Sequence, residues 1–409
     1  MLTAKTIETV KATVPVLAEH GVAITTRFYQ NLFREHPELL NVFNHAHQRE
    51  GRQQAALAGA VYAAAKHIDD LGAVLPVVKQ IAHKHRSLGI LPEHYPVVGK
   101  NLLRAIKEIL GDAATDEILQ AWTEAYAVIA DAFIAVEREM YTQAETQPGG
   151  WAGFRPFVIA RKQPESDTIT SFYLRPADGG PIATFEPGQY ITLKLSIPGD
   201  PYTHLRQYSL SSAPHDPMYR ISVKREDARP DQEGTISTYL HRKLKEGDTV
   251  LVSAPAGDFV LDRTSDRPVV LLSAGVGLTP MVSMLNALVH DHPERRVTFI
   301  HATTSGQTHA MAEHLTEVAS AHPQVRSFLI YSRPTDADRT RGHFHKEGRI
   351  DLDWLTSVLP EEHADVYLCG PAPFLKDVRN ALLVHGVPPG HIHYEYFGPA
   401  ADIDAAPAS

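Results

Sequence analysis

The sequence is poor in cysteine, in long apolar runs and in positive charge. It holds one cysteine, Cys369, and a single thiol cannot build an internal disulfide, a four-thiolate zinc site or an iron–sulfur cluster. The most apolar stretch, 268–285, is broken by glycine, proline and serine, and the N-terminus has no apolar signal core. Acidic residues (48) outnumber Lys and Arg (39), which argues against a nucleic-acid-binding surface. We therefore expect a cytoplasmic protein with no obligate membrane attachment.

What is present changes in character along the chain of 409 residues, a length typical of two or three domains. Residues 1–146 read as successive amphipathic helices, 147–264 as short alternating runs, and 265–409 as apolar runs separated by helical stretches. These patterns predict a multidomain fold in three parts: an all-α domain, an antiparallel β-barrel with one helix near 235–244, and an α/β domain built on a parallel sheet covered on both faces.

The helical region has clear start and stop signals. Thr3 is predicted to cap the first helix and Gly21 to end it, and His36-Pro37 stops the second helix near Glu35. Further helices are predicted over 48–66, 74–88, 93–110 and 115–141.

Two stripes in this region place polar side chains among apolar ones. His85 shares a helical face with Val78, Ile81 and Leu88, whereas His83 points about 200° away. A lone histidine on an apolar stripe is usually a core or surface residue, so this spacing alone leaves metal ligation open. A second stripe joins Gln53 to Leu57 and Val61, and Tyr29 lies among Phe28, Leu32 and Phe33.

With these residues in register, the N-terminal region resembles the globin of the flavohaemoglobin family. The resemblance implies that His85 binds haem iron and that the distal side holds Tyr29, Phe43 (in NVFN), Gln53 and Leu57. It also implies that Tyr95 and Glu137 hydrogen-bond the ligating histidine. Such a carboxylate strengthens the histidine as a donor to iron and favours oxygen activation over storage. Lys84 matches a position that tunes redox balance, with a solvated surface lysine as the alternative.

Glu137 has a rival two residues away. It shares a helical face with Phe133 and Met140, whereas Glu139 points about 200° away. The face pattern therefore favours Glu137.

The middle region carries RQYS at 206–209, where Arg206 and Tyr208 point to one face of a strand. An arginine can neutralise a diphosphate and a tyrosine ring can stack on an isoalloxazine, although an exposed strand arginine is the plainer interpretation. A glycine-led helix start at 234–237 would seat a diphosphate. The ensemble resembles the FAD domain of the ferredoxin–NADP reductase superfamily. It implies FAD binding by Tyr190, Arg206, Gln207, Tyr208, Ser209, Lys224, Glu226 and Ser237.

The third region carries a glycine turn, Gly275, Val276, Gly277, Leu278, Thr279 and Pro280, between a predicted strand and a helix. Its glycines let backbone approach a pyrophosphate, although such a turn can be purely structural. CGPAPF and EYFGP resemble the same superfamily. They imply Cys369 and Gly370 beside the nicotinamide, and Tyr396, Phe397, Gly398 and Pro399 at the flavin, with Glu395 affecting electron transfer. A buried structural thiol is the alternative for Cys369.

The resemblance implies nitric oxide dioxygenation, in which NAD(P)H reduces FAD, FAD passes single electrons to haem b, and NO and O2 become nitrate. Two alternatives stay open: a gas-sensing or storage globin with an attached reductase, and a flavin reductase for other acceptors. Arg333 can bind the NADPH ribose phosphate or be a surface arginine, so NADH and NADPH both remain possible. We expect a monomer acting on small molecules, with a lipid in the distal pocket as an open alternative.

Overall fold

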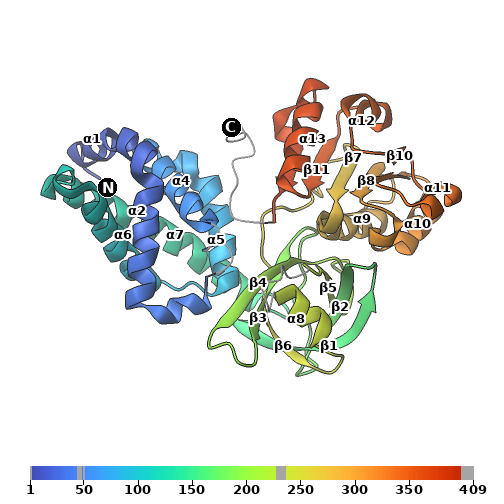
Figure 1. Cartoon of the computed structure of the whole chain (residues 1–409), viewed down its shortest axis with the longest axis horizontal. Coiled ribbons are helices and arrows are strands. Elements are labelled where there is room, and N and C mark those ends of the chain that lie inside the picture. Colours follow the sequence, from blue (N-terminus) through green and yellow to red (C-terminus); the bar gives the residue numbers. More distant parts are fainter. Residues whose placement is uncertain (1, 44–47, 49–50, 227–235, 398–409) are drawn as a thin grey trace. The chain divides into compact units, whose positions relative to one another are not determined.

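The structure is a computed structural model that describes residues 2–43, 48, 51–226 and 236–397 (Figure 1). The backbone divides into two compact units, residues 1–155 with 192–206, and residues 156–191 with 207–409. This division does not follow the three predicted domains, so the boundaries 1–146, 147–264 and 265–409 remain predictions.

The helical region contains no strand before residue 154 among the residues described. Its helices are α1 (Ala4–Ala12), α2 (Val14–Glu35), α4 (Arg52–Lys66), α5 (Leu75–Leu88), α6 (His94–Leu110) and α7 (Asp116–Thr146). Short 3-10 turns follow α2 (η1, Pro37–Asn41), precede α5 (η2, Leu71–Val74) and follow α6 (η3, Gly111–Ala113). One apolar core joins α2, α6 and α7 through Phe28, Leu32, Leu102, Ile106 and Trp122.

Three predicted helix boundaries are wrong, one of them the end of α7, which runs to Thr146 and not to residue 141. Thr3 caps α1 as predicted, but α1 ends at Ala12, and α2 begins at Val14 with proline in its first turn. Gly21 lies buried inside α2, where an added Cβ would stand 3.4 Å from the Cβ of Ala58 in α4. The glycine therefore permits a close helix crossing instead of ending a helix. The helix predicted to start at residue 48 begins at Arg52, after Gly51 with its left-handed φ of 72°.

The middle region forms a six-stranded sheet in the order β4-β3-β6-β1-β2-β5. The strands are β1 (Phe154–Pro164), β2 (Ile169–Pro176), β3 (Tyr190–Ser196), β4 (Thr203–Ser209), β5 (Tyr219–Lys224) and β6 (Thr249–Ser253). An antiparallel bridge between Leu210, just after β4, and Ile221 of β5 joins the two outer strands and closes the sheet as a barrel. Helix α8 (Ile236–Arg242) interrupts the strands as predicted, while Gly234 and Thr235 lie outside the described residues.

The last region is a parallel sheet in the order β10-β9-β8-β7-β11-β12. Its strands are β7 (Val269–Ala274), β8 (Val297–Thr303), β9 (Val325–Tyr331), β10 (Lys346–Glu347), β11 (Asp365–Cys369) and β12 (Ile392–Glu395). Its helices are α9 (Leu278–Asp291), α10 (Ala312–Ala321), α11 (Asp336–Arg341), α12 (Leu352–Val358) and α13 (Ala372–Val384). Figure 1 shows helices on both faces: α9 and α10 cover the core around Leu271 and Phe299, and α12 and α13 cover the core around Leu272 and Ile300.

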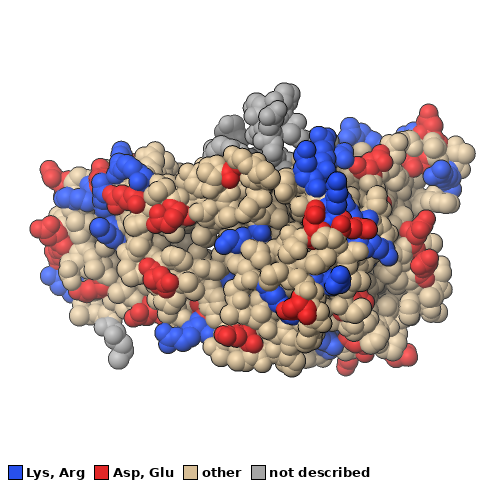
Figure 2. All heavy atoms as spheres, turned by 90° about the horizontal axis from the view of Figure 1, so that it is seen from below, with Lys and Arg blue, Asp and Glu red and all other residues tan. Residues whose placement is uncertain are grey.

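The surface charge and the apolar length of α7 bear on the expectation of a cytoplasmic protein. On the face seen in Figure 2, Lys and Arg are interspersed with Asp and Glu. Within the described part of the chain, α7 is long and apolar enough to cross a bilayer by length and composition. Core helices pass the same test, so this is weak evidence for a membrane span.

Candidate functional site

His85 lies near the end of α5, which begins with Pro76 in its first turn and ends at Gly89, a left-handed residue with φ of 79°. The His85 Nδ1 atom is 2.7 Å from Glu137 Oε1 and 3.2 Å from Tyr95 Oη. Tyr95 Oη in turn donates to the same carboxylate oxygen at 2.6 Å. The structure thus brings together the three residues that were predicted on three separate helices.

The electrostatics of this trio fix the proton of the Tyr95 hydroxyl. Burial raises the pKa of Tyr95 well above its usual range, and the Glu137 carboxylate raises it further. The phenol therefore stays protonated and donates to the carboxylate. Glu137 is buried and Glu139 is exposed, which agrees with the predicted choice between them.

The Nε2 atom of His85 is the atom that a haem iron would need. When Nδ1 donates to Glu137, Nε2 is the ring nitrogen left to bind a metal. The His85 side chain is 31% exposed, whereas that of Glu137 is 3% exposed. A haem in a globin takes one protein nitrogen. The residues present therefore fit this group, and within the described residues no cluster of His, Cys, Asp and Glu is arranged for a bare metal ion.

The predicted distal residues form an aromatic cluster with one polar tip. The Tyr29 ring stacks on Phe33 at 5.7 Å between centroids and meets Phe43 edge-on at 5.6 Å. Burial raises the pKa of Tyr29 above its usual range, while a hydrogen bond with Gln53 lowers it. The hydroxyl is therefore a protonated donor among apolar surfaces, and Leu57 packs against the same core.

The predicted flavin residues lie at the barrel. On β4, Arg206, Gln207 and Tyr208 are half-buried and Ser209 is buried. Tyr190 begins β3, and its ring lies against Gly257, whose φ is 119° and whose added Cβ would stand 3.0 Å from that ring.

Hydrogen bonds connect a second group of predicted flavin residues at the end of β5. Lys224 Nζ donates to Glu226 Oε1 at 3.0 Å, and the Glu226 backbone N–H donates to Ser237 Oγ at 3.0 Å. These contacts tie the start of α8 to β5. The side chains there can bind a charged or hydroxylated ligand, which fits part of FAD.

The glycine turn after β7 is packed directly against the turn after β11. A Cβ at Gly277 would stand 2.2 Å from the Cys369 carbonyl oxygen, and one at Gly370 would stand 2.7 Å from the Phe374 ring. Gly275 has a left-handed φ of 56°. Gly277 leaves no room for a side chain, so the two loops meet beside the start of α9, as a pyrophosphate seat requires. Within the turn, Thr279 Oγ1 donates to the Val276 carbonyl at 3.1 Å, and Leu278 and Pro280 are buried.

The remaining predicted residues differ in exposure. Cys369 is fully buried, and burial raises the pKa of its thiol well above the usual range, with a smaller contribution from Glu395 on the paired strand. The thiol is therefore part of the core, and the place of Cys369 beside the nicotinamide stays a prediction. Phe397 is 43% exposed, and Tyr396 is half-buried.

Three further predictions are not decided by the structure. Gly398 and Pro399 lie outside the described residues. Lys84 is half-buried. Arg333 is exposed and its backbone N–H donates to the Thr304 carbonyl at 2.8 Å, which leaves both interpretations of its side chain open.

Comparisons with known proteins cover the whole chain. Family models match a globin over residues 26–133 and an oxidoreductase NAD-binding domain over residues 271–380. A flavohemoprotein of Bacillus cereus is 58% identical over 403 residues, covering 98% of this chain and 100% of its own. One of Bacillus subtilis is 54% identical over 400 residues, covering 98% of both chains. The chain belongs to the flavohaemoprotein family. It is therefore an oxidoreductase.

Solved structures agree with this flavohaemoprotein architecture. A flavohemoglobin of Malassezia yamatoensis, solved with bound FAD and heme, has a TM-score of 0.85 at 30% identity and covers 97% of this chain and 100% of its own. The FAD/NAD-binding domain of a nitric oxide dioxygenase of Vibrio cholerae has a TM-score of 0.55 at 41% identity and covers 60% of this chain and 99% of its own.

The structure of this flavohaemoprotein also shows contacts that the sequence interpretation misses. The hydroxyls of Tyr126 and Tyr141 on α7 donate to the backbone carbonyls of Tyr95 and Ile90, each at 2.7 Å. The available signal for Tyr141 is its i+4 spacing from Glu137. The pair His301 and His309 lies at the carboxyl edge of the parallel sheet, and its spacing in the sequence gives no periodic signal.

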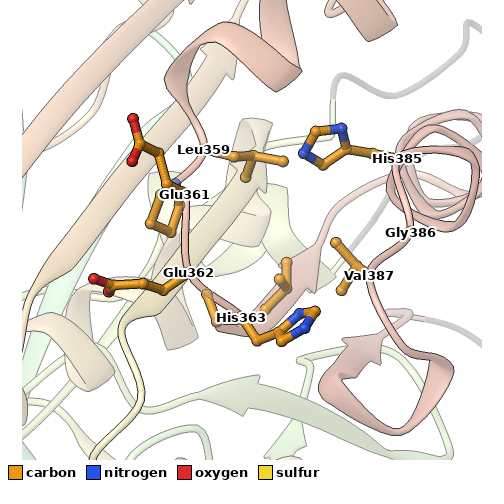
Figure 3. A pocket seen from close by; sticks show the side chains of 10 residues that line it. Leu359, Glu361, Glu362, His363, His385, Gly386 and Val387 are labelled. Atoms are coloured by element: carbon orange, nitrogen blue, oxygen red, sulfur yellow. The ribbon is translucent and has the colours of Figure 1, made fainter.

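A pocket of about 140 Å³ lies elsewhere in the nucleotide-binding region (Figure 3). It is lined by 359–364, Val366 and 385–387. Val366 is near the start of β11, whereas Cys369 ends that strand. The pocket is therefore at the amino edge of the parallel sheet, the opposite edge from the glycine turn, and none of the predicted site residues lines it.

Proposed function

We propose that this flavohaemoprotein is an NAD(P)H-dependent nitric oxide dioxygenase that converts NO and O2 to nitrate. The observation that carries the proposal is the contact of His85 Nδ1 with Glu137 Oε1 at 2.7 Å. A carboxylate at this distance draws the imidazole proton and makes the other ring nitrogen a stronger donor to iron. A protein that only stores oxygen gains nothing from this activation. The Vibrio cholerae relative is a nitric oxide dioxygenase, which supports the same activity.

The cofactors implied by family membership are haem b, FAD and NAD(P)H. When bound, haem supplies the iron at which the gases react, and FAD converts the two-electron hydride of NAD(P)H into single electrons for it. Among this chain's residues, His85 is assigned to the iron, Arg206 and Tyr208 to FAD, and the turn at 275–280 to the nicotinamide nucleotide. Lys84 and Glu395 are assigned to tuning of the redox balance.

Tyr29 is assigned the distal role. Its hydroxyl is a buried, protonated donor held by Gln53 among aromatic rings. A fixed donor in a dry pocket favours negative charge on an oxygen substrate without the cost of reorienting water. Tyr29 therefore favours oxygen activation, and Phe43 and Leu57 exclude water around it.

The cellular setting follows from this chemistry. A dioxygenase of this kind uses small gases and a reduced nicotinamide nucleotide, so we assign it to the cytoplasm, where that nucleotide is kept reduced. The sole thiol agrees with a reducing compartment.

Rapid mixing of the oxygenated, reduced protein with NO tests the proposal. We expect stoichiometric nitrate with wild type. With Tyr29→Phe we expect faster oxygen dissociation and slower NO consumption at limiting O2, by at most the roughly 2.7–4 kcal/mol that removal of one such donor costs elsewhere. NAD(P)H oxidation by an artificial acceptor serves as the control and should not change. Oxygenated protein that yields no nitrate would point to a storage globin, and wild-type kinetics in the variant would make Tyr29 a packing residue.

A further inference from the structure

Helix α7 carries aromatic residues on the same face as Glu137. Phe133, Glu137 and Tyr141 follow at i, i+4 and i+8, and Tyr126 precedes Phe133 by about two helical turns. The face of α7 that holds the carboxylate thus also holds two phenol hydroxyls, those of Tyr126 and Tyr141. Each hydroxyl reaches the backbone of one of the two segments that carry the partners of Glu137.

The hydroxyl of Tyr126 holds the first turn of α6, where Tyr95 lies. It donates to the Tyr95 backbone carbonyl at 2.7 Å, and the backbone N–H of Gly99 interacts with the same hydroxyl. These two backbone groups are an i, i+4 pair, so one side chain fixes a whole helical turn. A Cβ at Gly99 would stand 2.5 Å from the Tyr126 ring, and only glycine allows the ring to lie there.

The hydroxyl of Tyr141 holds the chain that follows α5, where His85 lies. It donates to the Ile90 carbonyl at 2.7 Å, and the Ile90 N–H donates back to the His85 carbonyl at 3.0 Å. Gly89, in its left-handed conformation, turns the chain between them. Tyr141 therefore fixes the end of the helix that presents His85.

We propose that Tyr126 and Tyr141 are positioning residues that set the donor strength of His85 toward iron. Their hydroxyls hold the backbones of Tyr95 and His85 to α7, the helix that carries Glu137. Two donors share one carboxylate oxygen at 2.6 and 2.7 Å, and hydrogen bonds this short weaken steeply when their donors shift or tilt. The inference rests on the proposed role of His85 as the haem ligand.

The test is the iron–histidine stretching frequency of the haem-loaded, ferrous, ligand-free full chain, measured by resonance Raman spectroscopy. Glu137→Gln removes the carboxylate charge and marks the weak-donor limit of this frequency. We expect Tyr126→Phe and Tyr141→Phe each to lower the frequency part of the way toward that limit, and the double variant to lower it further. Tyr62→Phe is the matched control, because no hydrogen bond of the Tyr62 hydroxyl is present among the described residues.

The outcomes distinguish the inference about the two tyrosines from the assignment of Glu137 as the partner of His85. A wild-type frequency in both tyrosine variants, with only a lower melting temperature, would show that the hydroxyls stabilise the fold and nothing more, and would overturn the inference. A wild-type frequency in Glu137→Gln would overturn the proximal assignment itself. If Tyr126→Phe fails to hold haem, Tyr141→Phe alone decides, since its hydroxyl acts on a different segment.

Discussion

The helical region and the parallel-sheet region surround histidine with different partners. His85 has a carboxylate oxygen 2.7 Å from Nδ1. His301 and His309 lie with their ring centroids 5.6 Å apart, and their described partners are the hydroxyls of Ser273, at 2.9 Å from His301 Nδ1, and Tyr331, at 3.2 Å from His309 Nδ1. All three rings have a hydrogen-bond partner, but only that of His85 is a charged acceptor.

This difference decides what each imidazole can do. Burial lowers the pKa of His301 to about 3 and that of His309 to about 4, so neither ring gains a proton near neutral pH. A hydroxyl partner occupies one ring nitrogen without activating the other, and Nε2 of His309 is buried without a partner among the described residues. A carboxylate partner strengthens the opposite nitrogen as a ligand. Among these three histidines, the assigned ligand is therefore distinguished by its carboxylate partner.

The largest expected effect is the loss of His85. His85→Ala should abolish stable haem binding while FAD is retained, because the variant removes the assigned iron ligand and leaves the barrel intact. Absorption spectra of the purified protein measure both cofactors. His83→Ala should keep its haem, and Arg206→Ala should show the reverse pattern, with FAD binding weakened by about 1.5–3 kcal/mol, roughly tenfold to a hundredfold. A normal haem spectrum in His85→Ala would contradict the assignment of His85 as the iron ligand.

Glu137→Gln should make His85 resemble the hydroxyl-bonded histidines. Losing such an outer partner typically costs about 10- to 100-fold in metal affinity or activity. We expect faster transfer of haem to apomyoglobin and slower NO turnover, with FAD content unchanged. Glu139→Gln, at the exposed neighbouring acid, is the control. Equal haem transfer from both variants would contradict the role given to the carboxylate.

His301 and His309 should make the nucleotide-binding region sensitive to acid. In the unfolded chain they take up protons below a pKa of about 6.5, whereas in the folded chain they resist protonation down to about 4 and about 3. The unfolded state thus binds more protons in this window, so stability is full above a pH of about 6.5 and falls as pH drops toward about 4. Unfolding followed by flavin fluorescence at a series of pH values measures this slope.

Replacing the titrating group tests the cause of that slope. His309→Phe should flatten the pH dependence, whereas His343→Ala, at an exposed histidine, should leave it unchanged. An unchanged slope in His309→Phe would assign the acid sensitivity to other groups.

The smallest effect is expected at the hydroxyl partner. Ser273→Ala removes the hydrogen bond to His301, which should lower the free energy of unfolding by about 0.5–1.5 kcal/mol. Urea unfolding of the holoprotein measures this. Haem content should not change, and a loss of haem in this variant would show that the two regions are coupled.

The sequence predicts the elements better than it predicts their contacts. Apolar periodicity places the helices of the globin and the strands of both sheets, because burial of one face or of both faces shapes each pattern directly. It misses the break between α1 and α2, although Pro15 in the first turn of α2 is a visible signal. Glycine often ends helices, which is why Gly21 is predicted to end one, whereas in the structure Ala58 packs against it.

In the candidate site, too, choices within one helix can be predicted and contacts between elements cannot. The shared face of Glu137 with Phe133 distinguishes it from Glu139, because that choice depends on one helix alone. Tyr126 is not predicted, since its hydroxyl acts on Tyr95 from another helix and only the folded chain shows the distance. His301 and His309 escape prediction for the same reason, because they meet at the end of a strand and the turn beyond it.

The close packing of Gly277 against the Cys369 carbonyl has a practical consequence. The residue that supplies this carbonyl also carries the sole thiol of the chain, which is fully buried in the apolar core that α9 covers. A thiol reagent can react with Cys369 only when this core opens, so the rate of modification measures local opening of the nucleotide-binding region. No label has to be introduced, and the spectra of haem and FAD can be followed in the same sample. The protein therefore carries its own probe for the motion that loading with a nicotinamide nucleotide should suppress.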